Sequence, residues 1–252
     1  MMYDNNRNLK RFLGLVMALA MTVCTMATTA MAADFSDVAA DAWYQEAVDY
    51  VSDEGLMAGV GGGRFEPGTA MTRGMLVTVL HRLDGTPAPS GSSSFTDVAA
   101  DAYYAQAVAW AAENSIVAGI GNNQYAPNNL MTRQQFATIL YRYAQHKGYD
   151  VADTAELSRF SDAAAVSDYA VEALCWAVGA GIVSGSDGNL MPAGSATRAQ
   201  AAAMLMRFVQ NVAPSEPEAP VEPDTPDEPE TSAEPVGEQR MRITVGDQVI
   251  YA

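Results

Sequence analysis

The sequence predicts a mainly α-helical protein built from three tandem repeats, each with two helices joined by a glycine-rich loop. A shift of 60 residues superposes residues 35–73 on residues 95–133 without a gap, and residues 160–198 form a third copy with one insertion and one deletion. The second half of each copy carries apolar residues at helical spacing. Because one copy can bury little apolar surface alone, the three copies are expected to pack together.

A secretory signal peptide is predicted at residues 1–33. Arg7, Lys10 and Arg11 precede an apolar stretch at residues 12–23, and small residues at 30–32 offer a cleavage site. The apolar stretch is too short to favour a membrane span, so none is expected after cleavage. Lipidation at Cys24 is a less favoured alternative, because Val23 is bulkier than the residue that such signals carry.

The first helix of each copy is expected to begin at a short polar residue that acts as its N-cap: Asp41, Asp101 and Ser167. Tyr44, Val48 and Val51 then lie at helical spacing on one face. A glycine after the helix is expected to reverse the chain with a positive φ, in the three copies Gly59, Gly119 and Gly185.

The second helix is expected to begin after a threonine N-cap, which the copies place at Thr72, Thr132 and Thr197. Gln135 and Gln200 follow three residues later and complete capping boxes in copies two and three, whereas Met75 cannot. The apolar face of this helix recurs at i, i+3, i+4 and i+7, in the first copy as Leu76, Val79, Leu80 and Leu83. This gives repeats at residues 34–86, 94–147 and 159–212.

Two further segments follow the repeats. Residues 213–238 are rich in proline and acidic residues and are expected to form a disordered linker. Residues 239–252 alternate apolar and polar residues around a Gly-Asp pair, which predicts a β-hairpin-like stub of a truncated domain, or a strand pair for another element.

Charge and composition exclude several classes of function. The formal net charge is -16, and removal of residues 1–33 leaves 11 Lys/Arg against 29 Asp/Glu. Such a charge repels nucleic acid, which is therefore not an expected partner. No cluster of His, Cys or carboxylates has the spacing of a metal site, and no catalytic constellation is evident, so we expect neither cofactor, metal nor enzymatic activity in this chain.

With these motifs in place, residues 34–212 resemble three S-layer homology (SLH) domains. The resemblance rests on the openings FSDV, FTDV and FSDA, an aromatic residue at a fixed position, the segments RFEP, QYAP and NLMP, and the helix starts TRGM, TRQQ and TRAQ. The glutamate usual in the last motif is replaced by Met75, Gln135 and Gln200. The resemblance implies a pseudo-threefold spindle with grooves between its prongs. It also implies a secreted protein held noncovalently at the bacterial cell wall by a secondary cell-wall polysaccharide or peptidoglycan-linked glycan, often one with pyruvate ketals.

The arginine after each threonine is the favoured ligand contact, and these residues are Arg73, Arg133 and Arg198. A cation is mildly unfavourable at a helix start, where free N–H groups and the helix dipole instead attract an anion. A guanidinium binds a carboxylate bidentately, so we expect these arginines to hold the ketal in preference to forming structural ion pairs. The second arginines, Arg82, Arg142 and Arg207, lie half a turn away and are interpreted as structural.

The remaining candidate contacts carry alternatives. The aromatic residues Trp43, Tyr103 and Tyr169 either stack on a sugar ring or pack in the core. The aspartates Asp37, Asp97 and Asp162 either accept sugar hydroxyls or, as we favour, form turns. The alternative functions are self-assembly of a structural surface layer and anchoring of an enzyme domain not contained in this chain.

Overall fold

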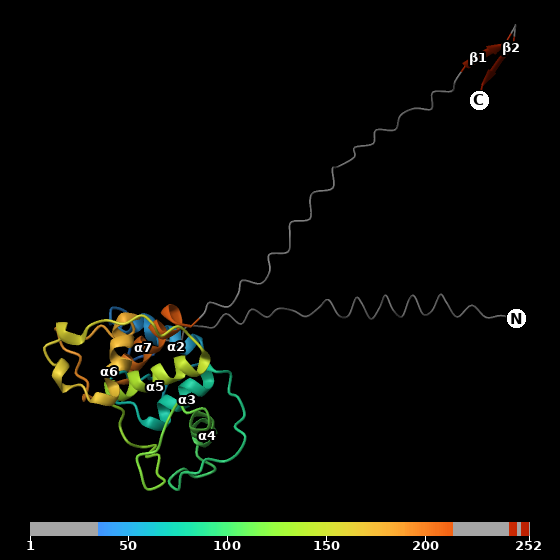
Figure 1. Ribbon diagram of the computed structural model, residues 1–252. Helices are drawn as coiled ribbons and strands as arrows, with labels where there is room; N and C mark the ends of the chain where they lie inside the picture. Colours follow the sequence, from blue (N-terminus) through green and yellow to red (C-terminus); the bar gives the residue numbers. More distant parts are fainter. Residues whose placement is uncertain (1–34, 214–241, 246–247, 252) are drawn as a thin grey trace, which may run out of the picture. The chain divides into compact units, whose positions relative to one another are not determined.

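Two α-helices from each repeat form the framework of residues 35–213, which together with residues 242–245 and 248–251 are what this computed structural model describes. The first helices are α2 (Gln45–Asp53), α4 (Ala105–Glu113) and α6 (Val171–Gly179), and the second are α3 (Arg73–Leu83), α5 (Arg133–Lys147) and α7 (Arg198–Asn211). Short 3-10 turns η1 (Leu157–Arg159), η2 (Ala163–Ala165) and η3 (Asp168–Ala170) lie in the third repeat. The mainly helical prediction is confirmed (Figure 1).

Each first helix packs against a second helix of a different repeat. The helix α4 lies against α3, α6 lies against α5, and α2 of the first repeat lies against α7 of the last (Figure 1). The order of repeats therefore closes into a ring, and every junction between repeats has the same composition of elements. This cyclic packing is the pseudo-threefold arrangement that the resemblance implies.

Three backbone hydrogen bonds close the ring at its centre. The amide of Met71 donates to the carbonyl of Ala196, that of Ala196 to Met131, and that of Met131 to Met71, each over 2.8 Å. All three residues are fully buried. A buried amide or carbonyl without a partner destabilises the fold, so each repeat depends on the other two to satisfy its central residue.

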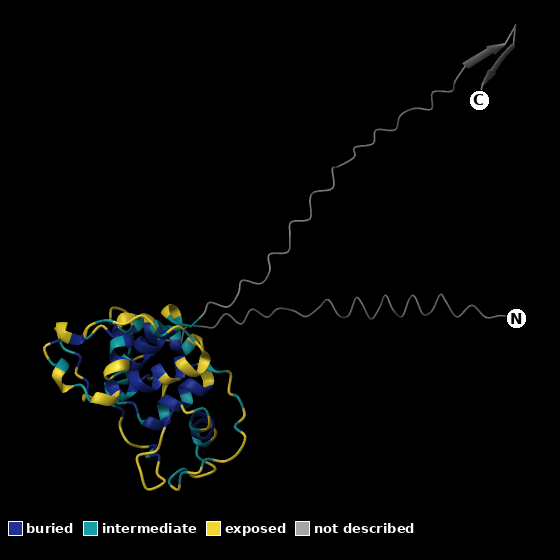
Figure 2. Ribbon diagram, in the orientation of Figure 1, coloured by how far each residue is buried: buried dark blue, intermediate teal, exposed yellow. Residues whose placement is uncertain are grey.

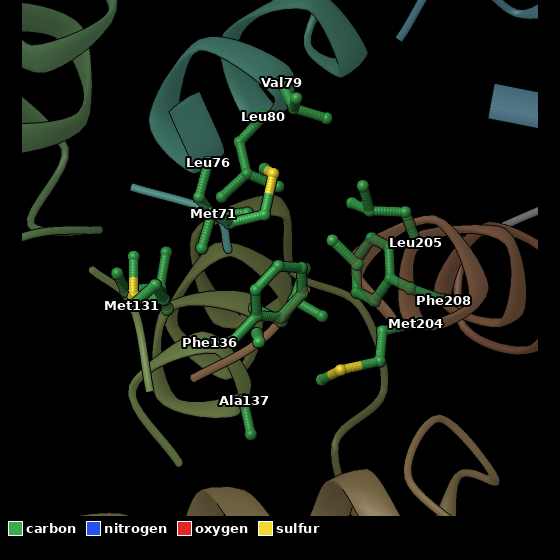
Figure 3. Close-up of a cluster of buried hydrophobic side chains, with 14 of the residues drawn as sticks. Met71, Leu76, Val79, Leu80, Met131, Phe136, Ala137, Met204, Leu205 and Phe208 are labelled. Carbon is green, nitrogen blue, oxygen red and sulfur yellow. The ribbon is translucent and has the colours of Figure 1, made fainter. Parts of the chain in front are cut away.

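One hydrophobic core joins the three second helices. Figure 3 shows Leu76 and Leu80 of α3, Phe136 of α5, and Phe208 of α7 in a single cluster. Figure 2 colours the ribbon by burial, and the buried residues gather on the central helices, whereas the outer loops and some helical turns are exposed. The apolar periodicity of these helices is confirmed, because the members at i, i+3 and i+4 are buried in every copy.

Two local predictions are wrong. The first helices begin later than expected and have N-caps without a side-chain hydrogen bond, at Tyr44, Tyr104 and Ala170, because turns precede each helix. Of the three reversal glycines only Gly185 has a positive φ, of 74°. The others are required for close approach, since a Cβ on Gly59 would lie 2.7 Å from Phe35 and 2.8 Å from the carbonyl of Arg64.

The chain divides into two units, residues 1–214 and 215–252. In the second unit β1 (Arg242–Val245) pairs antiparallel with β2 (Gln248–Tyr251), where the sequence predicts a hairpin. The predicted signal peptide and residues 214–238 of the predicted linker lie outside the described residues. Within the described part of the chain, no helix is long and apolar enough to cross a membrane.

Candidate ligand-binding grooves

The aspartate that opens each repeat organises the loop ahead of the second helix. The carboxylate of Asp37 accepts hydrogen bonds from the amides of Phe65 (2.8 Å) and Glu66 (2.9 Å). Asp97 and Asp162 bind the matching pairs of amides in repeats two and three. The second residue of each pair has a positive φ, at Glu66, Ala126 and Met191, so the carboxylate holds a strained turn in place. This geometry supports the turn-forming interpretation.

These hydrogen bonds favour the charged carboxylate. The amide of Phe65 is the main cause that lowers the pKa of Asp37, and the amide of Leu190 does the same for Asp162. For Asp97, burial acts to raise the pKa, but two amide donors outweigh it and the pKa is lowered. All three aspartates are therefore held ionised, each next to the arginine-bearing helix of another repeat.

Loop carbonyls of one repeat accept hydrogen bonds from the first amides of the second helix of another repeat. The amide of Arg73 donates to the carbonyl of Asn129 (3.0 Å), the amide of Gly74 to Pro127 (2.8 Å), and that of Met75 to the Thr72 hydroxyl. The starts of α5 and α7 are closed in the same way, by carbonyls of Pro192 and Gly194 and of Pro67 and Thr69. The expectation that these helix starts offer free N–H groups to an anion is therefore wrong.

The threonines cap the second helices as predicted. Thr72, Thr132 and Thr197 each accept from an amide three residues on, and capping boxes with Gln135 and Gln200 are present in α5 and α7 alone. The prediction that α3 has a threonine cap without a capping box, because Met75 stands at the third helical position, is also confirmed. Contact of these threonines with a ligand stays a prediction.

Two of the Thr-Arg arginines clamp the next repeat. Arg73 donates from Nε to the carbonyl of Tyr125 and from Nη2 to that of Ala118, both over 2.9 Å, and its guanidinium lies 4.5 Å from the centre of the Tyr125 ring. Arg198 makes the equivalent bonds, each of 2.7 Å, to Phe65 and Ala58. These two arginines therefore have a structural role, which depends on a neighbouring repeat, and their contact with a ligand stays a prediction. Their partners are carbonyls, so the alternative of an ion pair does not describe them.

Arg133 is held more loosely. Its Nε donates to the carbonyl of Leu190 (2.8 Å), but among the described residues neither Nη group has a hydrogen-bond acceptor. The side chain is half-buried, whereas Arg73 and Arg198 are buried. Burial lowers the pKa of Arg133, and the charge of Asp162 opposes that shift, so the group stays cationic at neutral pH.

Three grooves lie at the three junctions of the ring, and each is named here after the second helix that lines it. The α3 groove contains Arg198, Arg82 and Tyr103; the α5 groove contains Arg73, Arg142 and Tyr169; the α7 groove contains Arg133, Arg207 and Trp43. Each groove thus receives a Thr-Arg arginine from one repeat, a helix and glycine turn from the next, and an aromatic residue from the third. The volumes are about 230, 220 and 380 Å³ respectively.

The aromatic residues of the grooves are open to solvent. Trp43, Tyr103 and Tyr169 are 66%, 67% and 53% exposed, so the core-packing alternative is wrong for all three. Trp43 and Tyr103 each contact the following tyrosine edge to face and leave most of their surface open to the groove. Aromatic rings are common in the lining of ligand-binding sites.

The sequence analysis did not identify the second arginines, Arg82, Arg142 and Arg207, as groove residues. Arg82 does bind a carbonyl, that of Leu56 over 3.0 Å, as a structural residue would. Nevertheless Arg82, Arg142 and Arg207 each line a groove beside a Thr-Arg arginine of another repeat. Arg73 and Arg142 lie in the same groove as Tyr169. Burial raises the pKa of Tyr169, and the charges of these two arginines oppose that shift. Arginines half a turn apart on one helix point apart, and only the ring of repeats brings different copies together.

The described residues contain no group of three or more His, Cys, Asp or Glu side chains that could hold a metal ion. Fold and grooves define a module of three cyclically packed repeats with one groove at each junction. The family model described as "S-layer homology domain" matches residues 34–74, 94–137 and 159–202. The chain belongs to this family, and it is accordingly a secreted protein of the bacterial cell surface.

Relatives of different kinds share the repeats. The chain is 31% identical over 198 residues to the "Surface-layer 125 kDa protein" of Lysinibacillus sphaericus, covering 77% of this chain and 16% of the relative. It is 30% identical over 176 residues to the "Amylopullulanase" of Thermoanaerobacterium thermosulfurigenes, covering 68% and 9%. An "S-layer protein" of Bacillus thuringiensis subsp. finitimus is 28% identical over 133 residues, covering 52% and 16%. The chain thus spans less than a fifth of the length of these relatives.

Proposed function

We propose that the three repeats hold this protein at the cell wall by binding an anionic secondary cell-wall polysaccharide, with a pyruvate ketal as the anionic group. The observation that carries the proposal is the pairing, in every groove, of two arginines with one exposed aromatic ring. A guanidinium recognises a carboxylate through charge and a planar pair of donors. The aromatic face provides an apolar surface for a sugar ring.

The distribution of charge supports an anionic ligand. The chain carries 30 Asp/Glu against 14 Lys/Arg, yet six arginines are concentrated at the three grooves. Positive charge placed in a concave site of an otherwise acidic protein attracts an anion locally, while the remaining surface repels anionic polymers such as nucleic acid. A carboxylated saccharide satisfies both conditions.

The test is co-sedimentation of the protein with purified walls, before and after mild acid removal of ketal groups. We expect pelleting with intact walls and loss of pelleting after the acid treatment. The triple variant Trp43→Ala/Tyr103→Ala/Tyr169→Ala is expected to bind at least tenfold more weakly while it stays folded, because the three rings are exposed. The control variant Val60→Ala/Ile120→Ala/Leu130→Ala removes equally exposed side chains that line none of these grooves. Unchanged pelleting of the aromatic variant would contradict the proposal.

Two other functions are suggested by the relatives' names. Self-assembly into a surface layer predicts concentration-dependent particles without any wall present, which light scattering would detect. Anchoring of an enzyme predicts a catalytic domain in the same polypeptide, as in the amylopullulanase relative. Wall binding that depends on the groove aromatics without assembly favours the anchoring proposal over self-assembly.

A further inference from the structure

The three grooves differ in how firmly the Thr-Arg arginine is already bound. Arg73 and Arg198 each use Nε and Nη2 to bind two carbonyls and lie over an aromatic ring, of Tyr125 and Phe65. Arg133 uses only Nε, and the residue at the matching position is Leu190, which has no aromatic face. The α7 groove therefore contains the guanidinium with the fewest hydrogen bonds to the protein among the three.

The turn of the third repeat explains the missing hydrogen bond. The carbonyls of Ala58 and Ala118, which precede the reversal glycines, accept from Arg198 and Arg73. Ser184 is the equivalent residue beside Arg133, but this turn is one residue shorter and Gly185 adopts a φ of 74°, unlike Gly59 and Gly119. A different backbone conformation at this glycine redirects the local peptide groups, and no hydrogen bond joins Arg133 to Ser184 among the described residues.

A free pair of Nη groups matters for carboxylate binding. A bidentate contact needs two parallel N–H donors on one edge of the guanidinium. In Arg73 and Arg198 one of the two Nη groups, Nη2, already donates to a carbonyl of another repeat. In Arg133 neither Nη group has an acceptor within residues 35–213, so a carboxylate at the Nη1/Nη2 edge meets no competing protein acceptor.

The α7 groove is also the roomiest, at about 380 Å³ against about 230 and 220 Å³. Sites for small ligands span roughly 300–1,000 Å³, so this groove alone of the three falls in that range. Its aromatic residue is Trp43, which offers a larger face than the tyrosines of the other two grooves. Ser184, Ser186 and Gln200 add polar groups along its wall.

We infer that the α7 groove is the principal ketal-binding site, that Arg133 determines its specificity for the carboxylate, and that the α3 and α5 grooves bind the same group much more weakly. This inference rests on the proposed function and selects among its three grooves. It assigns to Arg73 and Arg198 the task of holding the repeats together, and to Arg133 the task of binding.

The test uses tryptophan fluorescence as a local reporter in each groove. Trp43 is exposed, whereas Trp110 and Trp176 are buried, so changes at the exposed ring can be separated by iodide quenching. The variants Trp43→Tyr/Tyr103→Trp and Trp43→Tyr/Tyr169→Trp move the exposed reporter into the α3 and α5 grooves. The probe is a methyl hexoside carrying a pyruvate ketal, with the ketal-free glycoside as control.

We expect the Trp43 reporter to respond to the ketal glycoside at a concentration at least tenfold lower than the reporters at positions 103 and 169. If either relocated reporter responds at the same or a lower glycoside concentration than Trp43, the inference is overturned while the proposed function stands. If Trp43 does not respond, the inference also fails. If, in addition, the protein does not pellet with walls, the proposed function fails with it.

A pair of charge variants gives a second measure. Arg133→Gln is expected to raise, at least tenfold, the glycoside concentration at which Trp43 responds. Far-UV circular dichroism checks that the variant is folded. Arg159→Gln is the matched control, since Arg159 is an exposed cation that lines none of the three grooves and for which the structure records no hydrogen bond within residues 35–213. It is expected to change the Trp43 response less than twofold. A larger loss for Arg159→Gln than for Arg133→Gln contradicts the assignment.

Discussion

At the residue scale, the same side chain has different tasks at equivalent positions. Arg73 and Arg198 each bind two carbonyls of a neighbouring repeat, one at a buried aromatic residue and one at an exposed alanine. Arg133 keeps two donor groups without a protein acceptor in the described part of the chain. The difference arises from Leu190 and from a turn that is shorter by one residue, not from the arginine. A residue type in a repeated motif therefore identifies a candidate, and its surroundings decide what that candidate does.

The loop aspartates lead to a prediction about pH. Their pKa values are lowered in the fold, so the carboxylates stabilise the native state above the ordinary aspartate pKa of about 3.9, and this contribution disappears as the pH falls through the lowered values. The variant Asp37→Asn/Asp97→Asn/Asp162→Asn is expected to have a lower urea midpoint than the wild type at pH 5–7. The difference in urea midpoint between the variant and the wild type should become smaller below about pH 4.

The exposed residue Asp41 provides the control, because Asp41→Asn should leave the midpoint close to that of the wild type. A gap for the triple variant that stays constant down to pH 2 would show that its loss of stability does not come from the carboxylate charge.

At the scale of elements, the glycine turn and the opening phenylalanine form one tightly packed unit in each repeat. A Cβ on Gly119 would lie 2.7 Å from the carbonyl oxygen of Gln124 and 2.7 Å from the ring of Phe95. The corresponding contacts at Gly59 and Gly185 are equally short. The turn that lines each groove is thus shaped by packing against the start of its own repeat.

This packing predicts the effect of an added methyl group. Gly119→Ala is expected to lower the free energy of unfolding by about 1–3 kcal/mol, because the backbone carbonyl of Gln124 cannot move aside cheaply. Gly68→Ala is the control, since a Cβ at Gly68 meets no atom within 4 Å. That variant should be as stable as the wild type or slightly more stable. Urea denaturation measures both, and equal stability of the two variants would contradict the packing argument.

At the scale of the whole molecule, the repeats form a closed ring rather than an open row. The last repeat holds the first through α7 against α2 and through Arg198, which donates to the carbonyls of Phe65 and Ala58. In an open row of repeats, stability is a sum of local terms and the ends can unfold separately. Closure removes the ends, so the three repeats should unfold together.

Arg198→Ala tests this closure. Loss of a charged donor to two carbonyls is expected to reduce the free energy of unfolding by about 3–6 kcal/mol, since each of the two hydrogen bonds contributes roughly 1.5–3 kcal/mol. The transitions followed by circular dichroism and by the fluorescence of Trp110 and Trp176 should still coincide at a lower urea concentration. Arg142→Ala, at an exposed arginine, should shift the midpoint little. Separate transitions for the two probes in the wild type would show that the repeats unfold independently.

The sequence by itself determined the repeats, their second helices with caps at Thr132 and Thr197, the membership in the SLH family, and the Thr-Arg arginines and aromatic residues as candidate contacts. These features are local in sequence, because caps and apolar periodicity depend on neighbours within a few residues. The same pattern also occurs in all three copies, so each copy supports the prediction made from the others. The placement of Trp43 and Arg133 in one groove, the clamping role of Arg73 and the use of the helix N–H groups by neighbouring loops were decided only by the tertiary structure. Each of these depends on a contact between different repeats, and hydrogen bonds to a carbonyl about 50 to 130 residues away leave no pattern in the local sequence.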